Sequence, residues 1–312
     1  MPLAVVTGAS TGIGFHTAGQ LAAKGYDVVC ACRNAGRAKE VIRSLHDWYG
    51  ASISLEFCEL DLASFASVQT FASGLALRHR SLDLLVCNAG VNSASVQQEP
   101  HAQLSQDGVD VLYQTNFLSH LLLVLLLLTL LRAARGRVVS VTSAVHRSAD
   151  RRDFSLVRSV REPYRSFYGL SKLAQIVTAE ELHKRFGGSG GVAFHSVNPG
   201  GVASDIWRGY PDPQRFLLDR VLVDPETAAS TVVRAARDWQ GAAPCRPKYW
   251  NGYKGAGLLS AFEYWSPLAA RESLVASKPS RDARDPALAE QVWRESLAAI
   301  HASGVNLDLD VL

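Results

Sequence analysis

Tyr168 and Lys172 lie four positions apart in the stretch YGLSK, and this pair could transfer a proton. Residues four apart on a helix share a face, so the two side chains would reach the same pocket. The pKa of an unperturbed tyrosine is about 10, and a neighbouring ammonium lowers it by stabilising the phenolate. The phenol could then give a proton to a carbonyl oxygen or accept one from an alcohol.

Ser143 ends an apolar run, RVVSVTS, and could act on the same oxygen. Its hydroxyl would hydrogen-bond the substrate oxygen and stabilise the charge that develops there. Each residue alone has a simpler interpretation: a surface helical pair for Tyr168 and Lys172, and a hydroxyl at a strand end for Ser143. Their combination with a glycine-rich loop upstream favours a catalytic site.

That loop, TGASTGIG at 7–14, follows the first apolar run of the chain. Glycine lets the backbone turn tightly and approach a pyrophosphate, which then sits on the amino end of the next helix. The position of the loop between a strand pattern and a helix pattern favours nucleotide binding over a purely structural turn. The spacing G-x3-G-x-G differs from the dinucleotide fingerprint G-x-G-x-x-G. The predicted cofactor contacts in the loop are Gly8, Ser10, Thr11, Gly12, Ile13 and Gly14.

Strands and helices that could position these residues alternate over the first 200 positions. The strand candidates are short, rich in Val, Leu and Ile, and nearly continuous, as in strands that are buried on both faces. Longer amphipathic stretches separate them. This pattern predicts an α/β fold, a doubly wound parallel sheet with helices on both faces. The candidate strands are 3–7, 27–32, 53–60, 82–87, 137–143 and 192–197.

A leucine-rich run, HLLLVLLLLTLL at 120–131, falls between the fourth and fifth candidate strands. The apolar stretch is shorter than the roughly 20 residues that a membrane-spanning helix needs. Its crossover position predicts a buried helix instead. Two further helices are predicted downstream, one opening at DPETAA with Asp224 as its cap and one over 286–300.

Composition excludes some functions. Lys and Arg number 32 against 29 Asp and Glu, and the resulting charge of +3 is too small to indicate nucleic acid as a partner. The N-terminus shows neither a signal peptide nor an anchor pattern, and no paired cysteine framework is visible, so we expect a reducing, cytoplasmic location. The cysteines are Cys30, Cys32, Cys58, Cys87 and Cys245.

Metal binding is not expected. Cys30 and Cys32 would share one face of a strand as small core residues. His16, His120 and His146 lie near the motifs without metal-ligand spacing, which favours structural roles. His195, inside a strand pattern, is expected to be a hydrogen-bonded core residue.

The motifs resemble those of the short-chain dehydrogenase/reductase family, in the family's order, over roughly residues 2–240. The resemblance rests on the threonine and glycines of the loop, the YxxxK stretch, Asn-Ala-Gly at 88–90 and Asn-Pro-Gly at 198–200. It implies a Rossmann fold of about seven strands in a single domain. Residues 1–250 would then hold the cofactor and the catalytic site, and 251–312 would form a C-terminal extension packed on the same domain.

The resemblance also implies an NADP(H)-dependent oxidoreductase. Tyr168 would be the general acid and base, Lys172 would lower its pKa, and Ser143 would polarise the substrate oxygen. Asn116 would support the proton relay, although alone it could be a helix cap. Asp61 would contact adenine with Leu62, or merely cap the following helix. The implied cofactor contacts are Asp61, Leu62, Asn88, Ala89, Gly90, Tyr168, Lys172, Pro199, Gly200 and Val202.

The end of the second strand favours NADP over NAD. An acidic residue there would hold the ribose 2′-hydroxyl of NAD, whereas an arginine suits the 2′-phosphate of NADP. Cys32 occupies this position, Arg33 and Asn34 follow it, and Arg37 is close by. The alternative is a solvated basic turn.

The retinol dehydrogenase-like branch is the subgroup that the chain resembles, through ACRN, DLASFASV, DGVDVLYQTNFLSHLLL, DPETAA and the interval between Ser143 and Tyr168. Many microsomal members carry an N-terminal membrane anchor, and this chain begins at the first strand, so membrane residence does not carry over. Relatives often form homodimers through the helices that contain Asn116 and Tyr168, and others are monomers. The resemblance leaves both states open.

Aromatic residues cluster in the loop after the sixth strand and in the extension. They favour a lipophilic carbonyl or alcohol substrate such as a retinoid, a steroid, a lipid aldehyde or an aromatic ketone. The alternative is that they pack the extension onto the core, as we expect for Tyr249 and Trp250. Cellular NADP pools are mostly reduced, which favours carbonyl reduction; a catalytically silent, NADP-binding regulator or scaffold is the competing function. The remaining aromatics are Trp207, Tyr210, Phe216, Tyr253, Phe262, Tyr264 and Trp265.

Overall fold

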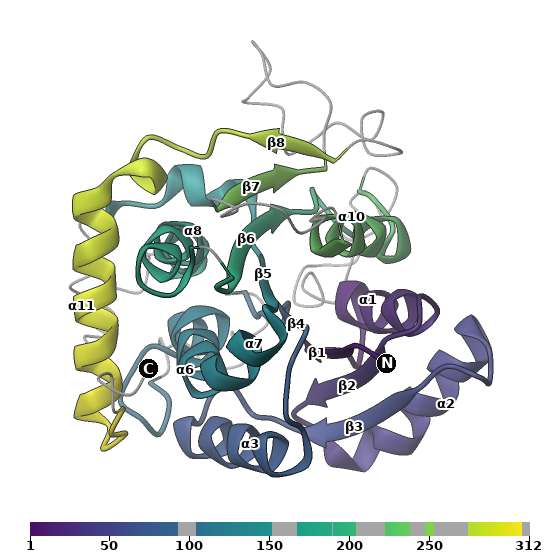
Figure 1. Ribbon diagram of the computed structural model, residues 1–312. Helices are drawn as coiled ribbons and strands as arrows, with labels where there is room; N and C mark the ends of the chain where they lie inside the picture. Colours follow the sequence, from purple (N-terminus) through teal and green to yellow (C-terminus); the bar gives the residue numbers. More distant parts are fainter. Residues whose placement is uncertain are drawn as a thin grey trace.

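A sheet runs through the middle of the molecule with helices on both faces (Figure 1). The computed structural model describes residues 1–92, 104–151, 167–188, 190–203, 222–237, 247–252 and 274–307. Within them the sheet has eight strands in the order β3-β2-β1-β4-β5-β6-β7-β8. All neighbours from β3 to β7 are parallel, and β8 pairs antiparallel with β7. The strands are β1 Leu3–Thr7, β2 Asp27–Cys32, β3 Leu55–Glu59, β4 Leu84–Cys87, β5 Arg137–Val141, β6 Ala193–Asn198, β7 Lys248–Asn251 and β8 Val275–Ser277.

The helices form two layers, each with its own apolar core. One core lies under α1, α2 and α10, and the other lies under α3, α6, α7 and α8. The predicted doubly wound Rossmann fold is therefore confirmed, in one domain. The helices are α1 Gly12–Ala22, α2 Ala38–Tyr49, α3 Phe65–Arg78, α5 Val111–Tyr113, α6 Ser119–Leu126, α7 Leu128–Ala134, α8 Phe167–Phe186, α10 Pro225–Arg237 and α11 Pro286–Ala302.

The leucine-rich run is buried, as predicted, but it is not one straight helix. A π-helical turn, Gln114–Leu118, leads into α6, and the chain bends at Leu127 before α7. Most of its leucines are fully buried against the sheet and neighbouring helices. No single helix among the described residues has the length and apolar composition to cross a membrane; Val111–Leu126 and Leu128–Ala134 meet these criteria only as a pair bent by 62°.

The two downstream helices begin where the sequence predicts. Asp224 caps α10 by accepting a hydrogen bond of 2.8 Å from the Thr227 amide. Asp285 caps α11 in the same way, through the Ala287 amide at 2.9 Å. The division of the chain at residue 250 stays a prediction.

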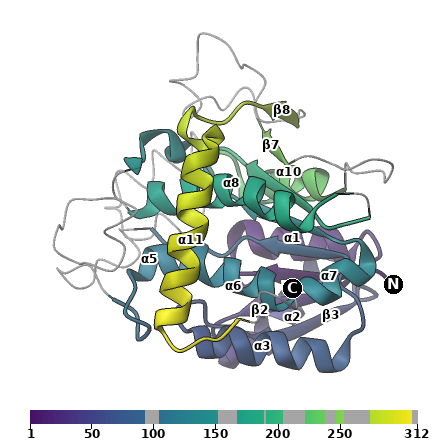
Figure 2. The ribbon, with the colours of Figure 1, turned by 60° about the vertical axis from the view of Figure 1, so that its left-hand side comes forward.

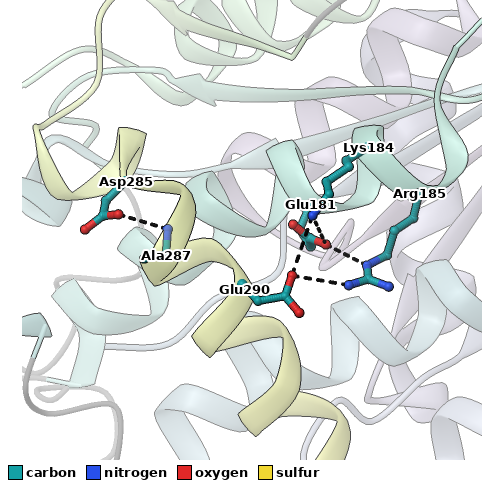
Figure 3. A network of polar contacts seen from close by, with 6 residues as sticks. All are labelled: Glu181, Lys184, Arg185, Asp285, Ala287 and Glu290. Carbon is teal, nitrogen blue, oxygen red and sulfur yellow. Dashed lines mark hydrogen bonds and ion pairs between the residues drawn. The ribbon is translucent and has the colours of Figure 1, made fainter.

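Helix α11 packs across α8, and the two helices cross in both views of the fold (Figures 1 and 2). Figure 3 shows the ion pairs that join them: Arg185 bonds Glu181 on its own helix at 2.7 Å and reaches Glu290 of α11 at 3.4 Å. The Arg185 guanidinium also lies 4.8 Å from the centroid of the Trp293 ring. The last described helix is thus fixed to the helix that carries Tyr168 and Lys172.

Candidate active site

The sheet reverses its winding between β1 and β4, which are neighbours in space. In open α/β sheets, ligands bind at the carboxyl ends of the strands at this reversal. Two predicted elements lie there: the glycine-rich loop follows β1, and Asn-Ala-Gly follows β4. The topology therefore brings together two motifs that are about 80 residues apart in the sequence.

The glycine-rich loop has the geometry of an anion cradle. Gly8 has a φ of +67° and Gly12 has a φ of +57°, both in the left-handed region. A Cβ at Gly14 would lie 2.3 Å from the Gly8 carbonyl oxygen, so only glycine lets the first turn of α1 lie this close to the loop. That turn holds no acidic residue, and the preceding Thr11 makes no side-chain cap. The amino end of α1 thus fits a phosphate group.

Thr7 joins the glycine-rich loop to the Asn-Ala-Gly loop. Its hydroxyl oxygen accepts hydrogen bonds from the Asn88 and Ala89 amides, both at 3.0 Å. The Asn88 side chain in turn donates to the Thr7 carbonyl at 2.8 Å. These bonds fix the two loops against each other on either side of the reversal point.

Asn116 lies inside the π-helical turn, so the helix-cap alternative is wrong. Its side chain exchanges two hydrogen bonds with the Val91 backbone, at 2.8 and 2.9 Å, and donates to the Ser171 hydroxyl at 3.2 Å. The backbone carbonyl oxygen of Asn116 accepts hydrogen bonds from the Gln175 side chain and from the His120 ring. The described contacts therefore give Asn116 a positioning role, linking the loop after β4 to α8.

Lys172 is buried, which rules out the interpretation of Tyr168 and Lys172 as a surface pair. Its ammonium donates to the Val141 carbonyl at 2.8 Å and lies 5.6 Å from the centroid of the Tyr168 ring. Burial lowers the pKa of Lys172 to about 7. A nearby anion would oppose this shift, because it favours the charged ammonium.

Ser143 lies just beyond β5 and caps a short 3-10 turn, Ala144–Ser148, through the Val145 amide at 3.4 Å. The neighbouring Thr142 hydroxyl donates to the Lys172 carbonyl at 3.1 Å. This bond joins the end of β5 to α8. Residues 142–151, here called the serine segment, therefore adjoin α8, the tyrosine-lysine helix that carries Tyr168 and Lys172.

The segment after β6 borders the same edge of the sheet. Gly200, with a φ of +101°, bonds the Asn198 side chain through its amide at 3.2 Å. Val202 forms an isolated parallel bridge with Val223. The predicted contacts Pro199, Gly200 and Val202 therefore lie beyond the carboxyl end of β6, next to β5.

The predicted specificity residues Arg33 and Asn34 are exposed beyond the end of β2. Cys32 beneath them is buried, and its pKa rises to about 11 through burial, although hydrogen bonds with Ala9 and Ser10 oppose the shift. These bonds put the Cys32 thiol against the glycine-rich loop. Arg37 forms an exposed ion pair with Glu40 at 3.2 Å.

Asp61 does not cap the following helix. Its carboxylate accepts from the Ala63 amide at 2.9 Å in a local turn, whereas Ser64 caps α3. Leu62 is buried, and its carbonyl accepts a hydrogen bond from Ser119. An adenine contact by Asp61 or Leu62 stays a prediction.

Several residues of the site had no predicted role there: Thr7, Ser171, Gln175 and His120. The Asn116 carbonyl can only accept, so the His120 Nδ1 carries the proton and Nε2 accepts from the Thr7 hydroxyl at 2.9 Å. Gln175 follows Tyr168 by seven positions on a largely apolar helix, a signal that could have placed it on the site face. No comparable pattern marks His120.

Of the aromatic residues, Tyr249 and Trp250 lie in the two cores, which confirms their predicted packing role. Cys30 and Cys32 are buried in the core on one face of β2, also as predicted. Other predictions fall outside the described residues. These concern Trp207, Tyr210, Phe216, Tyr253, Phe262, Tyr264, Trp265 and Cys245.

Three buried histidines should make the fold sensitive to acid. Burial lowers the pKa of His120, His146 and His195 from 6.5 to about 4. The stability that each neutral ring contributes is present above the unfolded pKa and is lost as the pH falls through the folded value. Burial raises the pKa of Asp110 to about 6, so protonation of Asp110 offsets a smaller part of this loss of stability as the pH falls.

We expect the free energy of unfolding to drop between pH 7 and pH 5 by on the order of 1–2 kcal/mol per histidine. Urea titrations at the two pH values measure it, and an unchanged midpoint would contradict the assignment.

The short chain dehydrogenase family model matches residues 2–214. The chain is 38% identical over 217 residues to WW domain-containing oxidoreductase of Gallus gallus, over 66% of this chain and 50% of that protein, so it spans about half the length of this relative. It is 36% identical over 318 residues to polyprenol dehydrogenase of Mus musculus, over 98% of this chain and 86% of that protein. The solved Pseudomonas aeruginosa RhlG/NADP active-site complex is similar with a TM-score of 0.57 and 26% identity, over 75% of this chain and 89% of that one.

Proposed function

Because the chain belongs to the short chain dehydrogenase family, we propose that it is an NADP(H)-dependent oxidoreductase that interconverts a carbonyl and an alcohol. One observation carries the proposal. The buried Lys172 ammonium lies 5.6 Å from the centroid of the Tyr168 ring, on a helix bonded to both Asn116 and the serine segment. This arrangement supports acid-base chemistry at the phenol.

In carbonyl reduction, Tyr168 gives its proton to the carbonyl oxygen while Ser143 donates a hydrogen bond to the same oxygen. The nicotinamide, when bound, supplies the hydride. The Lys172 ammonium stabilises the phenolate that remains on Tyr168, and each charge favours the other. Asn116 keeps the loop after β4 and α8 in register.

The cofactor proposal rests on the loop, the amino end of α1 and the basic turn after β2. Gly8, Gly12 and Gly14 would let the pyrophosphate approach the first amides of α1. Arg33 would pair with the 2′-phosphate, and the buried Cys32 offers no carboxylate for a ribose hydroxyl. The RhlG complex contains NADP, which supports the same choice.

A lipophilic substrate is proposed from the aromatic residues of the sequence. The mouse relative is named for a polyprenol, a lipophilic alcohol, and this name agrees with the proposal. The proposal covers the retinoid, steroid, lipid aldehyde and aromatic ketone classes.

The proposal is tested by following NADPH oxidation with a panel of lipophilic aldehydes and ketones. We expect turnover of at least one member of the panel. Tight NADPH binding without turnover of any member would favour the silent regulator instead.

Arg33→Ala should weaken NADPH binding specifically. A charge-assisted hydrogen bond contributes about 1.5–3 kcal/mol, which corresponds to a rise in the Kd for NADPH of roughly 10-fold to 100-fold. The Kd for NADH should change less than about twofold, because NADH lacks the 2′-phosphate. Arg43→Ala removes the same charge from an exposed position on α2 and serves as the control. Equal effects of Arg33→Ala on both cofactors would refute the assignment.

A further inference from the structure

His146 joins the catalytic serine segment to a segment more than 130 residues later in the chain. Its Nδ1 lies 2.8 Å from the Ser143 carbonyl oxygen, and the Ser280 amide donates to its Nε2 at 3.1 Å. A carbonyl can only accept and an amide N–H can only donate, so Nδ1 carries the proton and Nε2 is unprotonated. The ring therefore makes both bonds only as one neutral tautomer.

Burial makes this link more than a surface contact. His146 is 1% exposed, and its ring packs edge-on against Tyr249 of β7, with centroids 5.4 Å apart. The Ser143 carbonyl accepts from both the His146 amide and the His146 ring, so the histidine fixes the backbone of the serine twice. Loss of the ring would leave a buried polar group without this donor, which is costly in a protein interior.

Two arginines of the serine segment bond the same stretch of chain. Arg147 donates to the Lys278 carbonyl at 3.1 Å, and Arg151 pairs with Asp285 at 2.8 Å. Asp285 caps α11, which packs on α8. Residues 278–285, here called the docking segment, therefore bond three residues that follow the serine: His146, Arg147 and Arg151. The docking segment also packs against α8 and leads into α11.

We propose that His146 is a positioning residue through which the docking segment keeps Ser143 in its catalytic position. This role rests on the proposed oxidoreductase function. In this proposal the orientation of Ser143 depends on the docking segment, which is far from it in the sequence. The C-terminal region would therefore contribute to catalysis as well as cover the helical layer.

Four substitutions separate the two hydrogen bonds. In His146→Asn the side-chain nitrogen takes the place of Nδ1 and can donate to the Ser143 carbonyl, but the shorter side chain cannot reach the Ser280 amide. In His146→Gln the side-chain oxygen can take the place of Nε2 and accept from the Ser280 amide, but the Ser143 carbonyl loses the ring donor. Ser280→Pro removes the amide hydrogen itself, and Ser280→Ala keeps it as the matched control.

We expect His146→Asn, His146→Gln and Ser280→Pro each to lower kcat about tenfold, the effect of one lost hydrogen bond. The KM for NADPH should stay within about twofold, and Ser280→Ala should resemble the wild type. His146→Asn combined with Ser280→Pro should be no slower than the slower single variant, because both remove the same bond. Multiplying effects, or a wild-type kcat in Ser280→Pro, would overturn the proposal. Thermal melts confirm that each variant is folded at the assay temperature.

Hydrogen exchange tests the link without any turnover. In Ser280→Pro the amides of 142–149 should exchange faster than in the wild type, and in His146→Asn those of 278–285 should do so. Faster exchange confined to the substituted segment would refute the link. Should the wild type turn over no substrate, the proposed function and the positioning role fall together, while the exchange data still decide whether His146 joins the two segments.

Discussion

Replacing Tyr168 with phenylalanine is expected to lower kcat for carbonyl reduction by roughly 10³-fold, within the range for loss of a general acid. The ring remains, so the packing of α8 should be kept, and only the proton that moves to the substrate oxygen is removed. The Kd for NADPH should stay within about threefold, because all the other predicted cofactor contacts are kept. Steady-state kinetics and NADPH fluorescence titration measure the two quantities.

Tyr26→Phe is the matched control. Tyr26 is a buried tyrosine just before β2, and the same atom is removed there at a distance from the predicted catalytic residues. We expect its kcat to equal that of the wild type. Turnover by Tyr168→Phe above a tenth of the wild-type rate would show that another group supplies the proton.

Gly14→Ala should abolish cofactor binding at working concentrations. The added methyl group would lie 2.3 Å from the Gly8 carbonyl oxygen and 2.4 Å from the side-chain nitrogen of Asn88, so the glycine-rich loop must move away from α1. Overpacking of this kind costs about 1–3 kcal/mol of stability. Displacing the amides that face the pyrophosphate should raise the Kd for NADPH by roughly 100-fold, equivalent to one or two charge-assisted hydrogen bonds.

Gly74→Ala is the control for this substitution. Gly74 also lies within a helix, α3, but a Cβ there would meet only the end of the Arg78 side chain, at 3.6 Å. Because alanine favours helix over glycine, we expect Gly74→Ala to raise the free energy of unfolding by about 0.5–1 kcal/mol and to leave the Kd for NADPH unchanged. Binding of NADPH by Gly14→Ala with nearly wild-type affinity would contradict the proposed cradle.

The sheet could be predicted because strands that are buried on both faces show it as continuous apolar runs. For β1 and β2 the predicted and observed bounds agree, and for β3 to β6 they differ by one or two residues. The three-residue β8 carries too short a pattern to recognise. The bend at Leu127 was also missed, because a run of leucines has no periodicity that marks a break.

The candidate site divides in the same way. Residues with distinctive chemistry at short spacing, such as Tyr168 and Lys172, could be found from the sequence. Structural roles were expected for His120 and His146, but their distant hydrogen-bond partners could not be predicted: Thr7 for His120 and Ser280 for His146. Only the fold determines which buried donor meets which acceptor. Asn116 could be found from the sequence by its resemblance to a relay residue. The two donors to its backbone carbonyl, the His120 ring and the Gln175 side chain, could not be predicted in this way.

The most direct test of the central claim is the transfer of deuterium from NADPH in which both hydrogens at C4 of the nicotinamide are deuterium. The wild-type protein and the Tyr168→Phe variant are incubated with the panel of lipophilic aldehydes and ketones, and the alcohols are analysed by mass spectrometry. We predict that the wild type forms an alcohol with one deuterium on its carbinol carbon and that the variant forms almost none. Labelled NADPH that binds to the wild type but transfers no deuterium to any carbonyl would contradict the account.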